Sequence, residues 1–293
     1  MAQQVPIDPD ALHGTEGADG TVAVAPDLSC RRTMIANVLF LGVPHRPGWV
    51  LVDAGVTGSA HAIEAAAARR FGEGVPPAAI LLTHGHFDHV GALHSLLERW
   101  DVPVYAHPLE MPYLDGSASY PPADPGAGGG LMTLLAPLFP RSPVDVRRWL
   151  RPLPPDNSVP GLSDWQVIHT PGHSVGHVSF WRERDGCLVA GDAFTTTAPE
   201  SAYATATQEP ELHGPPRYFT HDWQAAHDSV RRLAALQPEV VVTGHGRPMH
   251  GQTMRTALHG LADRFEILAV PEGGRYVNDP QRAEDGSAYR RRG

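Results

Sequence analysis

Lysine is absent from this chain of 293 residues, and cysteine is scarce. All 23 basic residues are arginines, which excludes chemistry that needs a lysine, such as a Schiff base or a phosphate-binding P-loop. The two cysteines, Cys30 and Cys187, lie far apart in the sequence, and Cys187 begins a short apolar run. We therefore expect two buried thiols and no disulfide.

The sequence also lacks an apolar run long enough to cross a bilayer. Residues 1–20 contain neither the basic start nor the apolar core of a secretion signal, so we expect a cytoplasmic protein without membrane contact. A net charge of -9 and an isoelectric point near 6.0 argue against a surface that binds nucleic acid. The oligomeric state stays open, a homodimer included.

Histidine, in contrast, is abundant, with 17 residues. An apolar stretch typical of a buried strand ends at Thr83, and four side chains that can bind metal follow it within six positions. They are His84, His86, Asp88 and His89. Such crowding would leave unpaired polar atoms in a closed cleft unless a cation collects them, so the loop predicts a metal site.

The same local pattern recurs along the chain: a short apolar strand, a small residue, and then a histidine or an aspartate. It occurs at Asp53, His84, His173, Asp192 and His245. Glycine at such positions lets the backbone bend and the side chains converge, and we expect the five strand ends to share one sheet edge.

Without Asp53, the loop and the strand ends supply five imidazoles and two carboxylates. One tetrahedral zinc ion uses only four ligands, so the set predicts two ions. Nitrogen and oxygen donors without sulfur favour zinc, with iron and manganese as alternatives.

Three regions differ in composition. Residues 1–30 are polar and are expected to form a loose arm, residues 31–270 alternate between strand and helix patterns, and residues 271–293 read as a polar, frayed tail. Within the middle region, residues 108–160 are rich in proline and glycine yet carry large apolar side chains. We expect this insertion to be a packed cap over a cleft in a single domain.

Among the helices predicted from apolar spacing, two are long. The first would follow the histidine loop directly, from Val90 to Trp100, and the last would run from Met254 to Leu268.

The ordered set of motifs resembles the metallo-β-lactamase superfamily. His84-Gly85-His86-Phe87-Asp88-His89 is followed by His173 in Thr-Pro-Gly-His-Ser, Asp192 in Ala-Gly-Asp-Ala and His245 in Thr-Gly-His-Gly. The resemblance covers Asp53 to His245. It implies a fold of the α/β (α+β) class, an αββα sandwich with the metals at the edge between its two sheets.

The resemblance also implies roles for these residues. His84, His86 and His173 would hold one metal ion, Asp88, His89 and His245 a second, and Asp192 would bridge the two. A hydroxide between the ions would attack the substrate, and Asp88 would in addition carry a proton to the leaving group. Asp53 would orient a ligand histidine by a hydrogen bond, and His177 is expected to play a similar supporting part.

Departures from the patterns of individual family branches reduce the number of expected substrate classes. True β-lactamases of the family generally have cysteine or serine where this chain has Asp192, so a β-lactam substrate is not expected. Glyoxalase II enzymes rely on basic residues including lysine, and the lactonases often carry a tyrosine just after the bridging aspartate, where this chain has Ala193-Phe194-Thr195. Phosphotriesterase-like members share the ligands.

We therefore predict a dinuclear zinc hydrolase that cleaves a small ester, lactone or thioester. A phosphotriesterase on the same site is one alternative. An iron-dependent persulfide dioxygenase with a single metal ion is an alternative of another class.

Aromatic residues are candidates for the substrate pocket, although in such stretches they more often pack in the core or a lid. The candidates are Tyr113, Tyr120, Phe194, Tyr203 and Phe219. Four further histidines are expected not to bind metal: His107, His169, His221 and His250.

Overall fold

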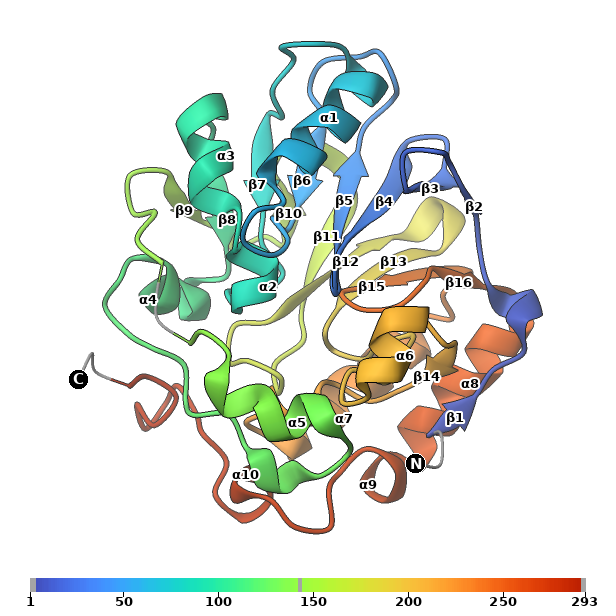
Figure 1. Ribbon diagram of the computed structural model, residues 1–293, viewed down its shortest axis with the longest axis vertical. Helices are drawn as coiled ribbons and strands as arrows, with labels where there is room; N and C mark the ends of the chain where they lie inside the picture. Colours follow the sequence, from blue (N-terminus) through green and yellow to red (C-terminus); the bar gives the residue numbers. More distant parts are fainter. Residues whose placement is uncertain (1–3, 142–143, 291–293) are drawn as a thin grey trace.

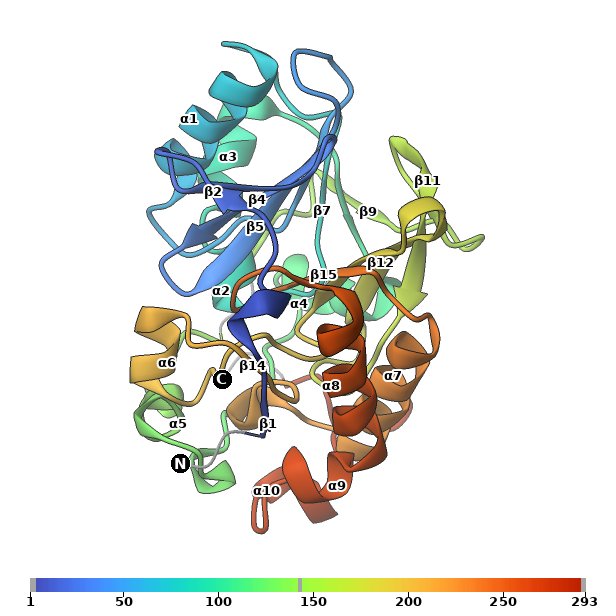
Figure 2. The ribbon, with the colours of Figure 1, turned by 90° about the vertical axis from the view of Figure 1, so that its right-hand side faces the viewer.

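A computed structural model describes residues 4–141 and 144–290. Two β-sheets pack against each other, and helices cover the outer face of each sheet (Figures 1 and 2). Apolar side chains fill the space between the sheets and the space under each helical layer. The α/β class and the αββα arrangement that the sequence predicted are confirmed.

The larger sheet has eight strands. Their order follows the chain: β2 (Thr15–Glu16), β3 (Thr21–Ala25), β4 (Leu28–Thr33), β5 (Ala36–Leu41), β6 (Val50–Val52), β7 (Ala79–Leu81), β8 (Val104–Ala106) and β9 (Leu150–Pro152). Neighbours are antiparallel as far as β6 and parallel from there on. Helices α1 (Ala60–Phe71) and α3 (Leu93–Trp100) connect the parallel strands and pack on the outer face (Figure 1).

The smaller sheet has six strands. In spatial order they are β10 (Ser158–Val159), β11 (Leu162–His169), β12 (Val178–Arg182), β13 (Cys187–Gly191), β15 (Val240–Thr243) and β16 (Met249–His250). Helices α7 (Trp223–Ala235) and α8 (Gly251–Asp263) cover its outer face (Figure 2). The Asp222 carboxylate caps α7 by accepting a hydrogen bond of 3.0 Å from the Ala225 N–H.

Both predicted long helices are interrupted. The first divides into α2 (Phe87–Val90) and α3 at Ala92, whose φ of -99° and ψ of 1° depart from the helix. Gly91 just before it lies against the backbone of residues 56 and 57, where an added Cβ would be 2.3 Å from Thr57 N. The last divides into α8 and α9 (Phe265–Leu268) at Arg264. The apolar spacing continues across both breaks, so periodicity alone could not locate them.

The expectation of a loose arm over residues 1–30 does not hold for the part that the structure describes. Strand β1 (Val5–Pro6) pairs with β14 (Glu211–Leu212), and β2, β3 and β4 extend the larger sheet. Leu28 and Cys30 are buried between the sheets. This polar segment could not form a stable sheet alone. Pairing of β4 with β5 supplies backbone hydrogen bonds, and Leu28 and Cys30 supply apolar contact with the core.

The C-terminal segment is likewise packed as far as it is described. It contains α10 (Arg275–Asn278), whose Tyr276 is buried, and the Tyr113 hydroxyl donates a hydrogen bond of 2.9 Å to Ala288 O. The described part of this segment therefore packs beside the predicted cap and is not frayed. Most of its polar side chains lie on the exposed outer side, which is why the composition suggested a tail.

The predicted cap contains short helices, and its end belongs to the two sheets. The helices are η2 (Pro108–Glu110), α4 (Met111–Leu114), η3 (Pro125–Ala127), α5 (Leu131–Leu135) and η4 (Ala136–Leu138). Strands β9 and β10 then join one edge of each sheet, where a proline such as Pro152 is tolerated. Within residues 4–141 and 144–290, no helix has both the length and the apolarity to cross a bilayer.

Candidate metal centre

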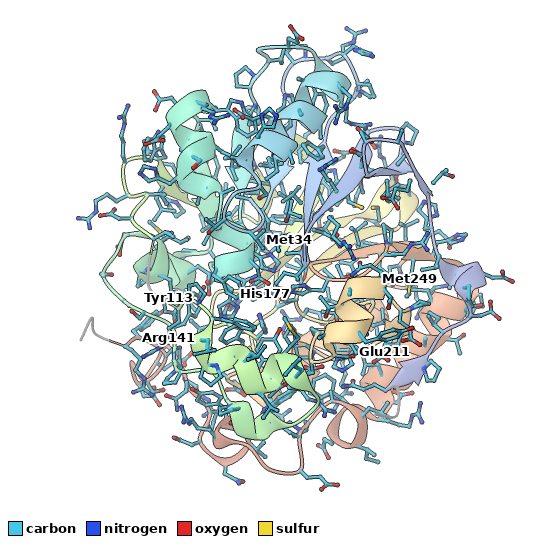
Figure 3. The ribbon with its side chains drawn as sticks, viewed as in Figure 1. Met34, Tyr113, Arg141, His177, Glu211 and Met249 are labelled. Carbon is cyan, nitrogen blue, oxygen red and sulfur yellow. The ribbon has the colours of Figure 1, made fainter. Side chains whose placement is uncertain are left out.

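The strand ends that the sequence singled out do meet, but they come from two sheets and not from one. Asp53 and His84 follow β6 and β7 of the larger sheet. His173, Asp192 and His245 follow β11, β13 and β15 of the smaller sheet. The candidate centre therefore lies where the edges of the two sheets come together. In Figure 3, His177, which neighbours the centre, lies near the middle of the molecule.

The predicted ligands form three overlapping groups, and within each group the donor atoms lie within 4.8 Å of one another. The groups are His84–His86–His173, His84–His89–Asp192 and Asp88–His89–His245. Every member is buried. The non-ligand histidines of the sequence analysis belong to none of these groups.

Asp192 lies between the two halves of the set. Its Oδ2 atom is 3.5 Å from His173 Nε2, 3.6 Å from His89 Nε2 and 3.1 Å from His245 Nε2. Asp88 Oδ2 approaches the same His245 nitrogen at 3.5 Å. One carboxylate oxygen thus faces imidazoles from both predicted metal positions, as a bridging ligand must.

Convergence this close requires a glycine at position 244. A Cβ there would lie 1.9 Å from Asp192 Oδ1 and 2.8 Å from His89 Cε1, so any side chain would displace the ligands. This is the role that the recurring glycines suggested in the sequence.

Asp53 fixes the orientation of His89 without facing the centre itself. Its Oδ1 accepts a hydrogen bond of 2.8 Å from Thr83 N, and its Oδ2 accepts from Thr83 Oγ1 at 2.7 Å and from His89 Nδ1 at 2.8 Å. Asp53 adopts a strained φ of 59°, which these three bonds stabilise. With Nδ1 engaged, His89 turns its Nε2 toward Asp192.

His177 fixes the backbone at Asp192. Its Nδ1–H donates to Thr170 O at 3.1 Å, which leaves its Nε2 to accept a hydrogen bond of 2.9 Å from Asp192 N. Both ring nitrogens are therefore occupied, so His177 supports a ligand and has no free donor for a metal.

Three other ligand histidines use Nδ1 outward in the same way, whereas His86 turns its Nδ1 to within 2.9 Å of His173 Nε2. The acceptors are Thr83 Oγ1 for His84 at 3.1 Å, Thr220 Oγ1 for His173 at 3.4 Å, and Ile35 O for His245 at 2.8 Å. The two threonine hydroxyls donate their own protons to Asp53 and Pro216, so they can accept from the rings. Each of these three rings consequently turns its Nε2 toward the centre.

Buried nitrogen and oxygen atoms without hydrogen-bond partners indicate that the predicted ligands fit a cation. The Nε2 atoms of His84, His86 and His89 and the Oδ1 atom of Asp192 are buried and have no hydrogen-bond partner among the described residues. Leaving such atoms unsatisfied is costly, and a metal ion would satisfy them.

The electrostatics of the site agree with that fit. Burial lowers the pKa of His84, of His86 and of His173 well below the ordinary value, which keeps these imidazoles neutral and their lone pairs free. Burial would raise the pKa of Asp192, but His245 and His89 lower it well below its usual range. Burial would lower the pKa of His245, but Asp192 raises it to about 9. Asp192 is thus a charged ligand at neutral pH.

The five aromatic candidates for a substrate pocket are placed very differently. Phe219 stacks on the ring of His86 at a centroid distance of 4.7 Å, and Tyr120 lies against the same ring at 4.3 Å. Tyr113 is buried and stacks on Tyr120. Phe194 is fully buried in the core under the outer helices of the smaller sheet. Tyr203, on α6 (Ala202–Thr207), is 69% exposed.

Phe219 belongs to an aromatic wall beside the ligands, whose other members were not among the predicted pocket residues. We use this name for Phe87, Phe139, Tyr218 and Phe219, which pack with Ala123, Ala136 and Met132 in one cluster. Phe87 and Phe139 approach to 5.3 Å between ring centroids. These residues come from α2, from the end of η4 and from η6 (Arg217–Phe219), and no local pattern links such distant segments.

The analysis also missed Glu110, a fully buried carboxylate in η2. Its sequence surroundings, Pro108-Leu109-Glu110-Met111, match no motif.

A buried set of nitrogen and oxygen donors where two sheets meet, in an αββα fold, defines a class of metal-binding proteins. Residues 31–245 match the metallo-beta-lactamase superfamily, and the chain belongs to this superfamily.

Similar proteins agree. The chain is 50% identical over 235 residues, covering 80% of this chain and 89% of the relative, to the "probable metallo-hydrolase YflN" of Bacillus subtilis. It is 26% identical over 165 residues to the hydroxyacylglutathione hydrolase of Bdellovibrio bacteriovorus, covering 56% of this chain and only 47% of that relative. A beta-lactamase domain protein from Burkholderia ambifaria shares the fold, with a TM-score of 0.59 and 23% identity over 90% of this chain and 81% of that one.

Proposed function

We propose that this protein is a metal-dependent hydrolase that binds two zinc ions and cleaves a small ester, lactone or thioester. Membership of the superfamily and the 50% identity to a probable metallo-hydrolase support the metal-dependent hydrolase. The observation that carries the two-metal part is the overlap of the donor groups at His84 and His89 around the oxygen of Asp192.

The seven predicted ligands would have different roles. His84, His86 and His173 would hold one ion, Asp88, His89 and His245 the other, and Asp192 would bridge them. When bound, the ions would supply a water made nucleophilic near neutral pH and would polarise the scissile carbonyl. Asp88, which also faces His245, would hold the proton of that water and pass it to the leaving group.

The aromatic wall favours a substrate with an apolar part. Phe87 stands between two proposed ligands in the sequence and is only half-buried, as is its neighbour Phe139. Their rings would exclude water from one side of the centre and pack against an apolar acyl or ring group. The relative named hydroxyacylglutathione hydrolase keeps an acyl-glutathione among the candidate substrates.

Metal analysis coupled to a substrate panel tests the proposal. Purified protein should contain two zinc ions per chain and should hydrolyse members of a panel of lactones and thioesters faster than phosphotriesters or β-lactams. Two ions with phosphotriesters as the best substrates would favour the phosphotriesterase alternative. A single iron ion per chain, with oxidation of persulfides, would overturn the hydrolase in favour of the dioxygenase.

A further inference from the structure

Glu110 is a buried carboxylate that accepts four hydrogen bonds. Its Oε1 accepts from Ser174 Oγ at 2.7 Å and from Gly176 N at 2.9 Å. Its Oε2 accepts from Gly85 N at 3.1 Å and from the Tyr120 hydroxyl. Charge-assisted bonds of this kind offset the cost of burying the carboxylate, so the side chain is held firmly in place.

The four donors join two segments that are far apart in the sequence. Gly85 lies between His84 and His86, whereas Ser174 directly follows His173. The two oxygens of Glu110 therefore tie together the loops that carry all three members of the His84–His86–His173 group. Glu110 belongs to none of the donor groups and acts on the centre only through these loops.

Tyr120 extends the same connection. Its hydroxyl accepts a hydrogen bond of 2.8 Å from Gly85 N while donating to Glu110, and its ring lies against the ring of His86. The sequence analysis placed Tyr120 among candidates for the substrate pocket. These contacts instead place it behind a predicted ligand, on the side held by Glu110.

We propose that Glu110 is a positioning residue that sets the separation of the two loops and thereby the metal affinity of the His84–His86–His173 group. This inference rests on the two-metal site of the proposed function. The second group, Asp88–His89–His245, shares the loop at Gly85 but has no member on the loop at Ser174 and no hydrogen bond to Glu110 among the described residues. The larger effect should therefore fall on the ion of the first group.

The test measures metal release and not turnover. Protein loaded with two zinc ions is mixed with an excess of a chromogenic chelator, and the release of each ion is followed in time. In Glu110→Gln, an amide nitrogen replaces one acceptor oxygen, so one loop loses its bonds. We expect one ion to leave about 10 to 100 times faster than in the unaltered protein, with a smaller change for the other ion.

Asp124→Asn is the matched control. Asp124 is also a buried carboxylate of the predicted cap, and it accepts hydrogen bonds from Gly126 N and Arg275 N, neither of which lies on a ligand loop. This variant should lose thermal stability but release both ions at the original rates. Equal acceleration in both variants would overturn the proposal, because it would show a general loosening of the fold.

Single-donor variants cover the case in which Glu110→Gln does not fold. Ser174→Ala removes one donor and Tyr120→Phe another, and each should accelerate the release of the same ion by a smaller factor. Unchanged release in both, with the fold intact, would overturn the role of Glu110. Protein that binds two ions but hydrolyses no member of the substrate panel would refute the proposed function alone, because the release rates would still decide the role of Glu110.

Discussion

The molecule buries histidine beside carboxylates in two places, and the two clusters differ in how their polar atoms are paired. In the first, the candidate metal centre, three imidazole nitrogens and a carboxylate oxygen have no partner among the described residues. In the second, His213 Nε2 lies 2.8 Å from Gln4 Nε2 and 3.1 Å from Glu200 Oε2, and its Nδ1 lies 2.9 Å from Gly214 O. Glu211 also approaches His213, at 3.8 Å.

The second cluster is a closed ion pair, and it lies apart from the metal centre. Figure 3 shows Glu211 near β14, well separated in the view from His177. Burial of histidine with carboxylates is therefore no sign of a metal site by itself. Convergence of imidazole nitrogens and carboxylate oxygens, several of them unpaired, is such a sign, because one metal ion can satisfy them together.

The largest expected effect is the loss of a ligand from the first cluster. His86→Ala should remove metal from the His84–His86–His173 group and reduce kcat/KM more than about a thousandfold, which corresponds to about 4 kcal/mol of transition-state stabilisation. Metal content and kinetics on the best substrate of the panel measure both effects. A fully active variant that retains all its metal would refute the site.

The second largest effect is expected from metal removal, which should change the thermal stability through the first cluster only. Dialysis against a chelator should lower Tm, because ions present at about a hundred times their dissociation constant stabilise the fold by about 2.7 kcal/mol. Adding zinc back should restore Tm. The same difference between metal-free and metal-loaded protein should be seen in His213→Gln, since the second cluster offers no converging donors; a His213→Gln variant that no longer responds to zinc would contradict this distinction.

The contrast also shows what the sequence could predict. Four of the predicted ligands fall within positions 84–89, and the other three follow apolar strands and have small neighbours. Local spacing was therefore sufficient to select the seven residues whose donor atoms the structure brings together. Asp53 was found by its place at a strand end, and its bond to His89 agrees with the supporting role that the family resemblance implied.

Long-range pairing limited the rest of the prediction. Glu200 and His213 lie in a stretch without regular periodicity, and only the folded chain brings them together. The same holds for Glu110, whose partners are 10 to 66 positions away. Residues 15–33 form strands because β5 offers a partner, and the local signal in so polar a segment is limited to a weak apolar alternation at residues 22–25.

The ion pair of His213 and Glu200 should make the free energy of unfolding depend on pH, separately from any effect of the metal centre. Burial lowers the pKa of His213, but Glu200 and then Glu211 raise it above its ordinary value of 6.5. Burial raises the pKa of Glu200, but His213 lowers it below its ordinary value of 4.5.

The sign of the effect follows from these two shifts. The histidine contribution is complete below pH 6.5 and is lost as pH rises through the raised pKa. The glutamate contribution is complete above pH 4.5 and is lost as pH falls through the lowered pKa. The pair therefore stabilises the fold fully between about pH 4.5 and 6.5, and less above that range.

His213→Gln tests this window. The variant should be less stable than the original protein by roughly 2 kcal/mol near pH 6, and the difference should shrink as the pH rises toward 9. Thermal unfolding of both proteins at matched metal content gives the difference directly and cancels the titration of the metal centre. A difference that grows with pH would show that His213 is buried as a neutral ring.

The smallest expected effect concerns Tyr203, which the sequence placed among candidates for the pocket. Its side chain is 69% exposed, whereas Phe219 stacks directly on His86. Tyr203→Phe should retain both metal ions and should change kcat/KM by less than about twofold, because an exposed hydroxyl contributes little. Phe219→Ala is the informative counterpart: it removes the ring on His86 and should raise KM for apolar substrates. A large rise in KM in Tyr203→Phe would instead show that substrate reaches α6, beyond the aromatic wall.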